Sequence, residues 1–466
     1  MVFSSAAFMF YFLPLTILLY HMVPDRMKNG VLLAVSLFFY GFGEPVYILI
    51  MVLSIFIDYF NGRLIEKYRH RKHLSRVFLI LSITANLGLL GFFKYADFFI
   101  GNINLFFGTD RELLSVALPI GISFFTFQTM SYSIDVYRGE VKAQKNLITF
   151  GTYVSMFPQL IAGPIVIYKD VEKQLEKRQT DLSHLTEGMH RFILGLGKKV
   201  LLANSIGALW EQVKMIPVEE LTVVTAWIGA AAFSLQIYFD FSGYSDMAIG
   251  LGKLFGFDFL ENFNYPFVSR SVTEFWRRWH MSLSKWFRNY LYFPLGGNRK
   301  GRWITLRNIA VIWMLTGFWH GASWNYVFWG MYFAVVLILE KTLLRKFLEK
   351  SGKLLSRVYT LPVLLVSFVI FALEDLSHLS GYLKVMAGKG ALMDEFSLYL
   401  MDRYALLFLL LLLFSTPWPY RRYLQFLDRR RRSQTVVSAM VLLGIFLLSA
   451  AYIVDGAYNP FLYFRF

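Results

Sequence analysis

The chain has 466 residues, of which 56% are hydrophobic and 18% aromatic, and its formal net charge is +16 at pH 7. Soluble domains usually contain about 45–50% apolar residues, so this composition favours a membrane protein. Cysteine is absent, which excludes disulfides, iron–sulfur clusters, thiolate zinc sites and a cysteine nucleophile on this chain. The basic residues fall in short loops between apolar runs, a positive-inside pattern that argues against a nucleic-acid partner.

Apolar runs that approach the roughly 20 residues of a membrane-spanning helix recur along the whole chain. We expect spans near residues 6–23, 29–43, 45–60, 77–95, 114–137, 193–212, 222–239, 303–319, 324–340, 358–373, 402–416 and 435–454. The basic loops 62–76, 341–357 and 421–432 can all be cytoplasmic at once, which places both termini outside. The sequence therefore predicts an all-α polytopic membrane protein. Residues 1–466 are expected to form a single integral membrane domain, with a motif-rich core at about 115–340.

Two stretches do not fit simple spanning helices. Residues 148–166 are apolar but contain Pro158, Gly163 and Pro164, which predicts a re-entrant hairpin buried in protein. Residues 240–307 carry many arginines and lysines among aromatic side chains. This composition is too charged for lipid, so we expect interfacial helices at the cytoplasmic mouth of a cavity.

A histidine inside an aromatic run is the main chemical signal. His320 lies in WMLTGFWHGASWNYVFWG, residues 313–330. A titratable side chain at membrane depth is costly and is read as functional by default, although a buried structural histidine is an alternative. A neutral imidazole can take a proton from an attacking hydroxyl and pass it to a leaving group. Asn325, in the same run, is a candidate for binding the donor or substrate.

A second histidine, His280, lies in EFWRRWHMSLS, residues 274–284. The spacing predicts one helix in which Trp276 and His280 share a face, because residues four apart are neighbours on a helix. Arg277, Arg278 and Trp276, with Lys285 just beyond, are candidates for binding the donor, since arginine suits phosphate recognition. The alternative is an interfacial belt of Trp and Arg without a catalytic role.

A third element, residues 234–246, ends an apolar span with polar groups. Gln236, Tyr238 and Asp240 are candidates for binding the donor or substrate. Asp240 and Asp246 could coordinate a metal or orient a histidine, but such residues also cap helix ends, and we assign no metal site. Phosphate-binding glycine loops and the common hydrolase and zinc-protease motifs are absent from the sequence.

Five motifs together resemble the membrane-bound O-acyltransferase (MBOAT) family. They are SLQIYFDFSGYSDMAIG at 234–250, ENFNYP at 261–266, EFWRRWHMSLS at 274–284, YLYFPLGGN at 290–298 and LTGFWHGA at 315–322. The resemblance is strongest to the bacterial branch that contains the alginate O-acetyltransferase membrane subunit, and it covers nearly the whole chain.

The resemblance implies a bundle of about 11 transmembrane helices, with re-entrant and interfacial helices around a central tunnel. It implies an O-acetyltransferase of the bacterial inner membrane that takes acetyl from a cytosolic thioester, expected to be acetyl-CoA, and holds no bound cofactor. The acceptor would be an extracytoplasmic polysaccharide, served by a separately encoded SGNH-type acetyltransferase partner. The family's essential histidine corresponds to His320, and its second active-site histidine to His280.

Three alternatives stay open at this point. One is a D-alanyl transferase for teichoic acid that uses a carrier-protein thioester. Another is a proton-coupled transporter with the histidines as a relay, which predicts inverted repeats that the sequence does not display. The third is a non-catalytic scaffold for polysaccharide export, in which both histidines would be dispensable.

Overall fold

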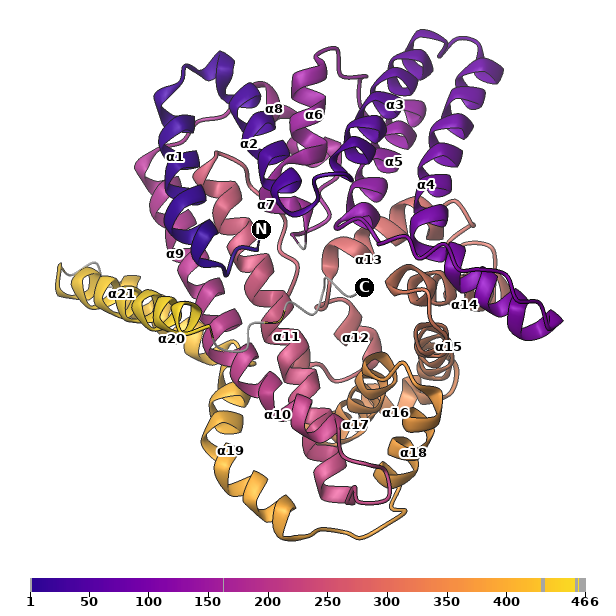
Figure 1. Ribbon diagram of the computed structural model, residues 1–466, viewed down its shortest axis with the longest axis vertical. Helices are drawn as coiled ribbons and strands as arrows, with labels where there is room; N and C mark the ends of the chain where they lie inside the picture. Colours follow the sequence, from indigo (N-terminus) through magenta and orange to yellow (C-terminus); the bar gives the residue numbers. More distant parts are fainter. Residues whose placement is uncertain (1, 162, 429–431, 457–459, 461–466) are drawn as a thin grey trace. The chain divides into compact units, whose positions relative to one another are not determined.

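The computed structural model describes residues 2–161, 163–428, 432–456 and 460, and in this part of the chain it is helical and contains no strand (Figure 1). The predicted all-α class is confirmed. The chain divides into two compact units. Unit 1 comprises Met1–Phe192 and Tyr244–Leu260, and unit 2 comprises Ile193–Gly243 and Glu261–Phe466.

The helices of unit 1 are mostly those of the N-terminal half. They are α1 (Leu13–Met22), α2 (Lys28–Gly43), α3 (Ile48–Lys67), α4 (Lys72–Phe107), α5 (Ile122–Arg138), α6 (Leu147–Ser155), α7 (Phe157–Leu160) and α8 (Tyr168–Glu176). Two helices, α9 (Leu182–Gly197) and α11 (Val223–Leu254), contribute residues to both units.

Unit 2 contains the remaining helices. They are α10 (Asn204–Lys214), α12 (Val272–Trp276), α13 (Met281–Phe287), α14 (Arg302–His320), α15 (Trp324–Leu339), α16 (Arg345–Lys350), α17 (Lys353–Ala372), α18 (Leu376–Met386), α19 (Glu395–Phe414), α20 (Trp418–Asp428) and α21 (Arg432–Val454). Short π-helical segments lie at Lys198–Ala203, Arg288–Tyr292 and Glu340–Leu344.

Eight helices of the described residues are long and apolar enough to cross a membrane. They are Ile48–Lys67, Lys72–Phe107, Leu182–Lys214, Val223–Leu254, Trp324–Lys350, Lys353–Ala372, Glu395–Phe414 and Gln434–Val454. A multi-pass membrane protein is therefore supported, while the expected number of about 11 spans stays a prediction.

Helix α3 shows how a spanning helix of unit 1 divides its two faces. Leu49, Leu53 and Phe60 are 68%, 49% and 55% exposed at spacings that place them on one side of the helix. Ser54 and Asp58 lie on the buried side. An exposed apolar stripe of this kind suits contact with lipid.

A buried polar network joins α3, α4 and α5, which lie side by side in Figure 1. The Asp58 carboxylate accepts hydrogen bonds from Ser82 of α4 and from Asn86 of α4 at 2.6 Å. It also accepts one from Ser133 of α5 at 3.0 Å. Hydrogen bonds between polar side chains are one of the forces that join helices in a membrane, so Asp58 ties the three helices together.

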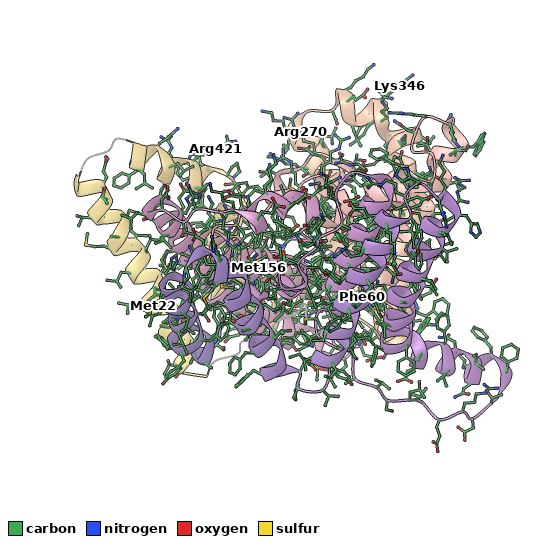
Figure 2. The ribbon with its side chains drawn as sticks, turned by 90° about the horizontal axis from the view of Figure 1, so that it is seen from above. Met22, Phe60, Met156, Arg270, Lys346 and Arg421 are labelled. Atoms are coloured by element: carbon green, nitrogen blue, oxygen red, sulfur yellow. The ribbon has the colours of Figure 1, made fainter. Side chains whose placement is uncertain are left out.

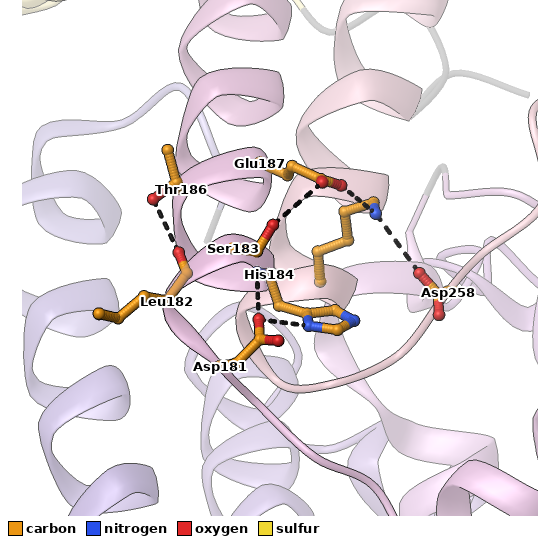
Figure 3. A network of polar contacts seen from close by, with 8 residues as sticks. Asp181, Leu182, Ser183, His184, Thr186, Glu187 and Asp258 are labelled. Carbon is orange, nitrogen blue, oxygen red and sulfur yellow. Dashed lines mark hydrogen bonds and ion pairs between the residues drawn. The ribbon is translucent and has the colours of Figure 1, made fainter.

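A second polar network joins the start of α9 to the end of α11 within unit 1 (Figure 3). Asp181 accepts a hydrogen bond from the backbone N–H of His184 at 2.9 Å and lies 2.8 Å from its Nδ1. Lys253 pairs with Glu187 at 2.7 Å and with Asp258 at 3.5 Å. These ion pairs are partly exposed, so each contributes little stability alone, and together they fix the direction of the two helix ends.

The two stretches that did not fit simple spanning helices, residues 148–166 and 240–307, differ in structure. Residues 148–166 form the short buried helices α6 and α7 separated by Met156, which is fully buried and labelled in Figure 2. The charged stretch 240–307 does not begin as an interfacial segment, because α11 continues without a break to Leu254. Only its later part is divided into the short helices α12 and α13.

The basic loops of unit 2 share a side. Arg270, Lys346 and Arg421 lie along the same edge in Figure 2. Lys346 and Arg421 belong to two of the three basic loops that were expected to be cytoplasmic, and the side of the membrane that these loops face stays a prediction. Residues 429–431 of the third loop lie outside the described part of the chain.

Candidate functional site

His320 is the last residue of α14, and a close contact between α14 and α15 fixes its position. A Cβ atom at Gly317 would lie 2.3 Å from the backbone oxygen of Tyr326 and 3.1 Å from the Cα atom of Gly330. Small residues allow two helix backbones to approach this closely in a membrane protein. The glycines thus hold together the helical hairpin that carries His320.

Aromatic rings surround the His320 side chain, which is only 7% exposed. Its ring centroid lies 5.0 Å from Trp329 and 5.2 Å from Phe371, both with edge-to-face geometry. The ring of Trp319 is 5.0 Å away. The imidazole therefore lies in a dry aromatic environment, where a hydrogen bond is electrostatically stronger than in water.

His280 does not lie on a continuous helix, so the predicted helix through residues 274–284 is wrong. Helix α12 ends at Trp276, and His280 adopts the left-handed conformation, φ +44° and ψ +54°, immediately before α13. Trp276 and His280 therefore do not share a helix face. Glu274 and Arg278 form an ion pair at 2.9 Å.

Tertiary hydrogen bonds that Asn262 accepts explain the break. The Asn262 backbone oxygen accepts from the N–H of Met281 at 3.0 Å. Its side-chain oxygen accepts from the N–H and hydroxyl of Ser282, at 3.2 and 2.9 Å. These bonds satisfy the first N–H groups of α13 without a preceding helical turn. Positive φ outside glycine is uncommon and clusters at functional sites.

The same contacts assign the tautomer of His280. The N–H of Ser282 can only donate, so the Asn262 atom that faces it must be the amide oxygen. This oxygen lies 3.2 Å from Nδ1 of His280, and so Nδ1 carries the proton. The lone pair of the neutral ring then resides on Nε2, which can accept a hydrogen bond.

Burial keeps His280 neutral. The side chain is 1% exposed, and desolvation lowers the pKa of His280 to about 3. At physiological pH the ring is therefore an uncharged acceptor at Nε2. It is not a source of positive charge for a developing oxyanion.

The two histidines contact the same aromatic residue of unit 2. The Trp319 ring lies 6.3 Å from His280 and 5.0 Å from His320. Phe241 also packs edge-to-face against His280, at 4.8 Å. Residues 40 positions apart in the sequence are thus brought to one buried cluster, and the catalytic roles of the two histidines stay a prediction.

Trp276 and Asn325 build the walls of this cluster. Trp276 lies 5.6 Å from Trp329 in an edge-to-face pair. Asn325 is fully buried and donates from its side chain to the backbone oxygen of Phe371 at 3.0 Å. This bond fixes the segment whose ring packs on His320, so Asn325 has a clear structural role next to the candidate base.

The candidates on α11 have partners inside unit 2. Tyr238 is 2% exposed and packs its ring against Trp279 at 6.2 Å, and Gln236 is equally buried. Asp240 forms an ion pair with Lys199 at 2.8 Å, with side chains 3% and 1% exposed. A role for these three residues in binding the donor stays a prediction.

The described part of the chain contains no group of three or more His, Asp or Glu side chains arranged to hold a metal ion. Asp240 pairs with Lys199 in unit 2, and Asp246 pairs with Arg191 in unit 1 at 2.7 Å. Each carboxylate therefore has a cationic side chain as its partner.

The three basic candidates differ in their availability to an anion. Arg278 is engaged with Glu274 and donates to the backbone oxygen of Asn264 at 3.1 Å. Lys285 is half-buried on α13, whereas Arg277 is exposed. Arg277 is therefore the most accessible of the three for a donor phosphate.

Sequence reasoning missed Asn262, Lys199 and Glu340. Lys199 also donates to Asn204 at 2.7 Å and to the backbone oxygen of Pro460. Glu340, 4% exposed, accepts three hydrogen bonds from the start of α12. For Lys199 and Glu340 the available signal was a charged side chain next to apolar residues, which does not reveal its partner, and for Asn262 it was the ENFNYP motif.

Comparisons with known proteins agree with the motifs. A family model described as the membrane-bound O-acyltransferase family matches residues 45–373. The chain is 41% identical over 380 residues to the probable alginate O-acetylase AlgI of Azotobacter vinelandii, covering 81% of this chain and 76% of the relative. It is 34% identical over 423 residues to the peptidoglycan O-acetyltransferase of Helicobacter pylori, covering 83% and 80%. Identity to the teichoic acid D-alanyltransferase of Bacillus subtilis is 29% over 282 residues, covering 56% and 70%.

Proposed function

Because this chain belongs to the membrane-bound O-acyltransferase family, and is thus an acyltransferase, we propose that it moves acetyl from a cytosolic thioester to an extracytoplasmic polysaccharide. The similarity to O-acetylases of two different polysaccharides supports acetyl as the group and a polysaccharide as the acceptor. The observation that carries the proposal is the buried aromatic cluster in which His320 and His280 contact the same tryptophan.

In the proposed reaction, His320 is the general base. It takes the proton from the acceptor hydroxyl while the hydroxyl oxygen bonds to the acyl carbon and the carbon–sulfur bond breaks. The thiolate leaves and receives that proton from His320. The dry aromatic surroundings of His320 support this role, because water competing with the acceptor hydroxyl is kept away.

His280 is proposed to orient the reacting groups. Its neutral ring with the lone pair on Nε2 suits acceptance of a hydrogen bond from an amide N–H of the acyl donor, and it does not suit donation to the thioester carbonyl. The fixed tautomer follows from the Asn262 contact. His280 thereby supports the positioning of the thioester for attack, and such positioning contributes strongly to rate.

Acetyl-CoA is the proposed donor. Arg277, with Arg278 and Lys285 nearby, would attract its phosphates at the cytosolic side. The thioester is already activated, so the reaction needs no bound cofactor. The direct acceptor is proposed to be either the polysaccharide or an SGNH-type acetyltransferase that relays acetyl to it, with the enzyme in the bacterial inner membrane.

D-Alanyl transfer from a carrier-protein thioester is the second candidate. The similarity to a teichoic acid D-alanyltransferase favours it, but that similarity is lower and covers 56% of this chain. A donor comparison separates the two. Turnover of acetyl-CoA supports acetylation, and turnover only of the charged carrier protein supports D-alanylation.

The experiment that tests the function follows labelled acetyl from acetyl-CoA in detergent, and then in native membranes that contain the partner and acceptor. We expect CoA release and label on the acceptor, both lost in His320→Ala. His184→Ala is the matched control, because His184 is partly exposed and lies in the separate network at the start of α9. Full activity of His320→Ala would refute the assigned base, and absence of transfer by the wild type in native membranes would refute the function.

A further inference from the structure

Helix α12 carries Trp276 and leads directly to His280, but it has only five residues. Isolated helices of this length are not stable in water, because nucleation is costly and few hydrogen bonds follow. Other contacts must therefore stabilise α12. One of them is local, since the Ser271 hydroxyl caps the helix by accepting from the N–H of Glu274 at 3.0 Å.

The remaining N-terminal groups of α12 are held by Glu340, which is 67 and 68 residues further along the chain. Its carboxylate accepts from the N–H of Val272 at 2.7 Å and from the N–H of Thr273 at 2.8 Å. It also accepts from the Thr273 hydroxyl at 2.6 Å. A buried carboxylate is costly unless it is hydrogen-bonded, and these charge-assisted bonds are of the strong kind.

Glu340 directly follows α15, a helix that packs against His320. Trp329 of α15 lies 5.0 Å from His320, and Phe333 lies 4.9 Å from Trp276 in an edge-to-face pair. One helix therefore contacts His320 near its start and Trp276 near its middle. At its end, Glu340 holds the first residues of α12.

We propose that Glu340 is a positioning residue for acyl transfer: it holds α12, and through α12 Trp276 and His280, in register with the hairpin that carries His320. Its importance for the reaction rests on the proposed function, whereas the clamp on α12 does not. Glu340→Gln keeps the size of the side chain but turns an amide N–H₂ toward at least one N–H donor. The short helix then loses its clamp while the aromatic packing is retained.

The test has two readouts on the full-length protein in detergent. The first is hydrogen–deuterium exchange in peptides covering 272–284, which we expect to become faster in Glu340→Gln. The second readout compares the rate of acyl transfer in a single turnover with the equilibrium affinity for acetyl-CoA. A displacement of about 1 Å at a reacting group can lower the rate about 100-fold, so we expect a loss of that order with donor affinity changed less than about threefold.

Glu349→Gln is the matched control, because Glu349 lies nearby in an exposed pair with Arg345. It should change neither readout. Thr273→Val removes only one of the three bonds, so its effect should be smaller. In the double variant Thr273→Val/Glu340→Gln, the effect on each readout should be smaller than the sum of the two single effects, because both residues act through one contact.

Unchanged exchange at 272–284 in Glu340→Gln would overturn the clamp. Faster exchange with wild-type turnover would overturn the positioning role. A loss of donor binding in parallel with turnover would also overturn it, because that result indicates general unfolding. Faster exchange in a protein whose wild type transfers no acyl group would leave the clamp standing and refute the proposed function instead.

Discussion

The contact between Asn262 and His280 makes a quantitative prediction about pH. Burial lowers the pKa of His280 to about 3, so the wild-type ring stays neutral across the range in which the enzyme can be assayed. Asn262→Asp would place a carboxylate where an amide oxygen now lies 3.2 Å from Nδ1. An opposite charge stabilises the protonated ring and raises its pKa.

The size of the shift follows from the geometry. Two unit charges about 4 Å apart interact by about 4 kcal/mol at an effective dielectric constant of about 20. One pKa unit corresponds to about 1.4 kcal/mol, so the pKa of His280 should rise by about three units, to about 6. The variant's ring is then protonated below that pH and neutral above it.

The assay is the rate of acyl transfer in single turnovers, compared between variant and wild type from pH 5 to pH 8. Protonation removes the Nε2 lone pair, so the ratio of rates should be constant above about pH 7 and should fall about tenfold per pH unit below the new pKa. Asn262→Ala, which leaves no carboxylate, should lower the rate equally at every pH. A variant-to-wild-type ratio that does not depend on pH for Asn262→Asp would refute the assigned tautomer and the role of Nε2.

Three further changes probe other parts of unit 2. Gly317→Ala places a Cβ 2.3 Å from the backbone oxygen of Tyr326, so it should destabilise the protein by roughly 1–3 kcal/mol and lower its melting temperature; an unchanged melting temperature would contradict the close contact. Lys199→Met leaves the buried Asp240 carboxylate without its cation and should cost about 3–5 kcal/mol. In thermal unfolding, the double variant with Asp240→Asn should be more stable than Lys199→Met, and the reverse order would contradict the buried ion pair. Arg277→Ala should raise the KM for acetyl-CoA several-fold at low salt and less at high salt, with kcat nearly unchanged, and a KM that does not move would exclude Arg277 from donor binding.

The helices were the part of the fold that the sequence could predict. Apolar runs indicated spans at 358–373 and 435–454, and the structure has helices at Lys353–Ala372 and Arg432–Val454. The span predicted at 77–95 is too short, since α4 extends from Lys72 to Phe107. Hydropathy detects only the part of a helix that is uniformly apolar, and α4 continues through polar residues at both ends.

The site was predictable where chemistry is concentrated in one short run. His320 stands out because a titratable side chain is surrounded by tryptophan and glycine in the sequence. The break at His280 was not predictable, because the local pattern favours a helix and the hydrogen bonds that Met281 and Ser282 donate to Asn262 override it. Lys199 and Asp240 are likewise 41 positions apart, and no periodicity relates them.

The network around Asp58 has a consequence for how the chain enters the bilayer. Asp58 lies at the middle of α3, where an aspartate costs about 2.5–3.5 kcal/mol during insertion of a single helix. Its partners Ser82 and Asn86 are on the next helix, and only residues 68–71 separate α3 from α4. Insertion of the two helices as one hairpin lets Asp58 reach its partners at once. The third partner, Ser133, arrives later with α5, so two of the three side chains that donate to Asp58 are available before α5 is inserted.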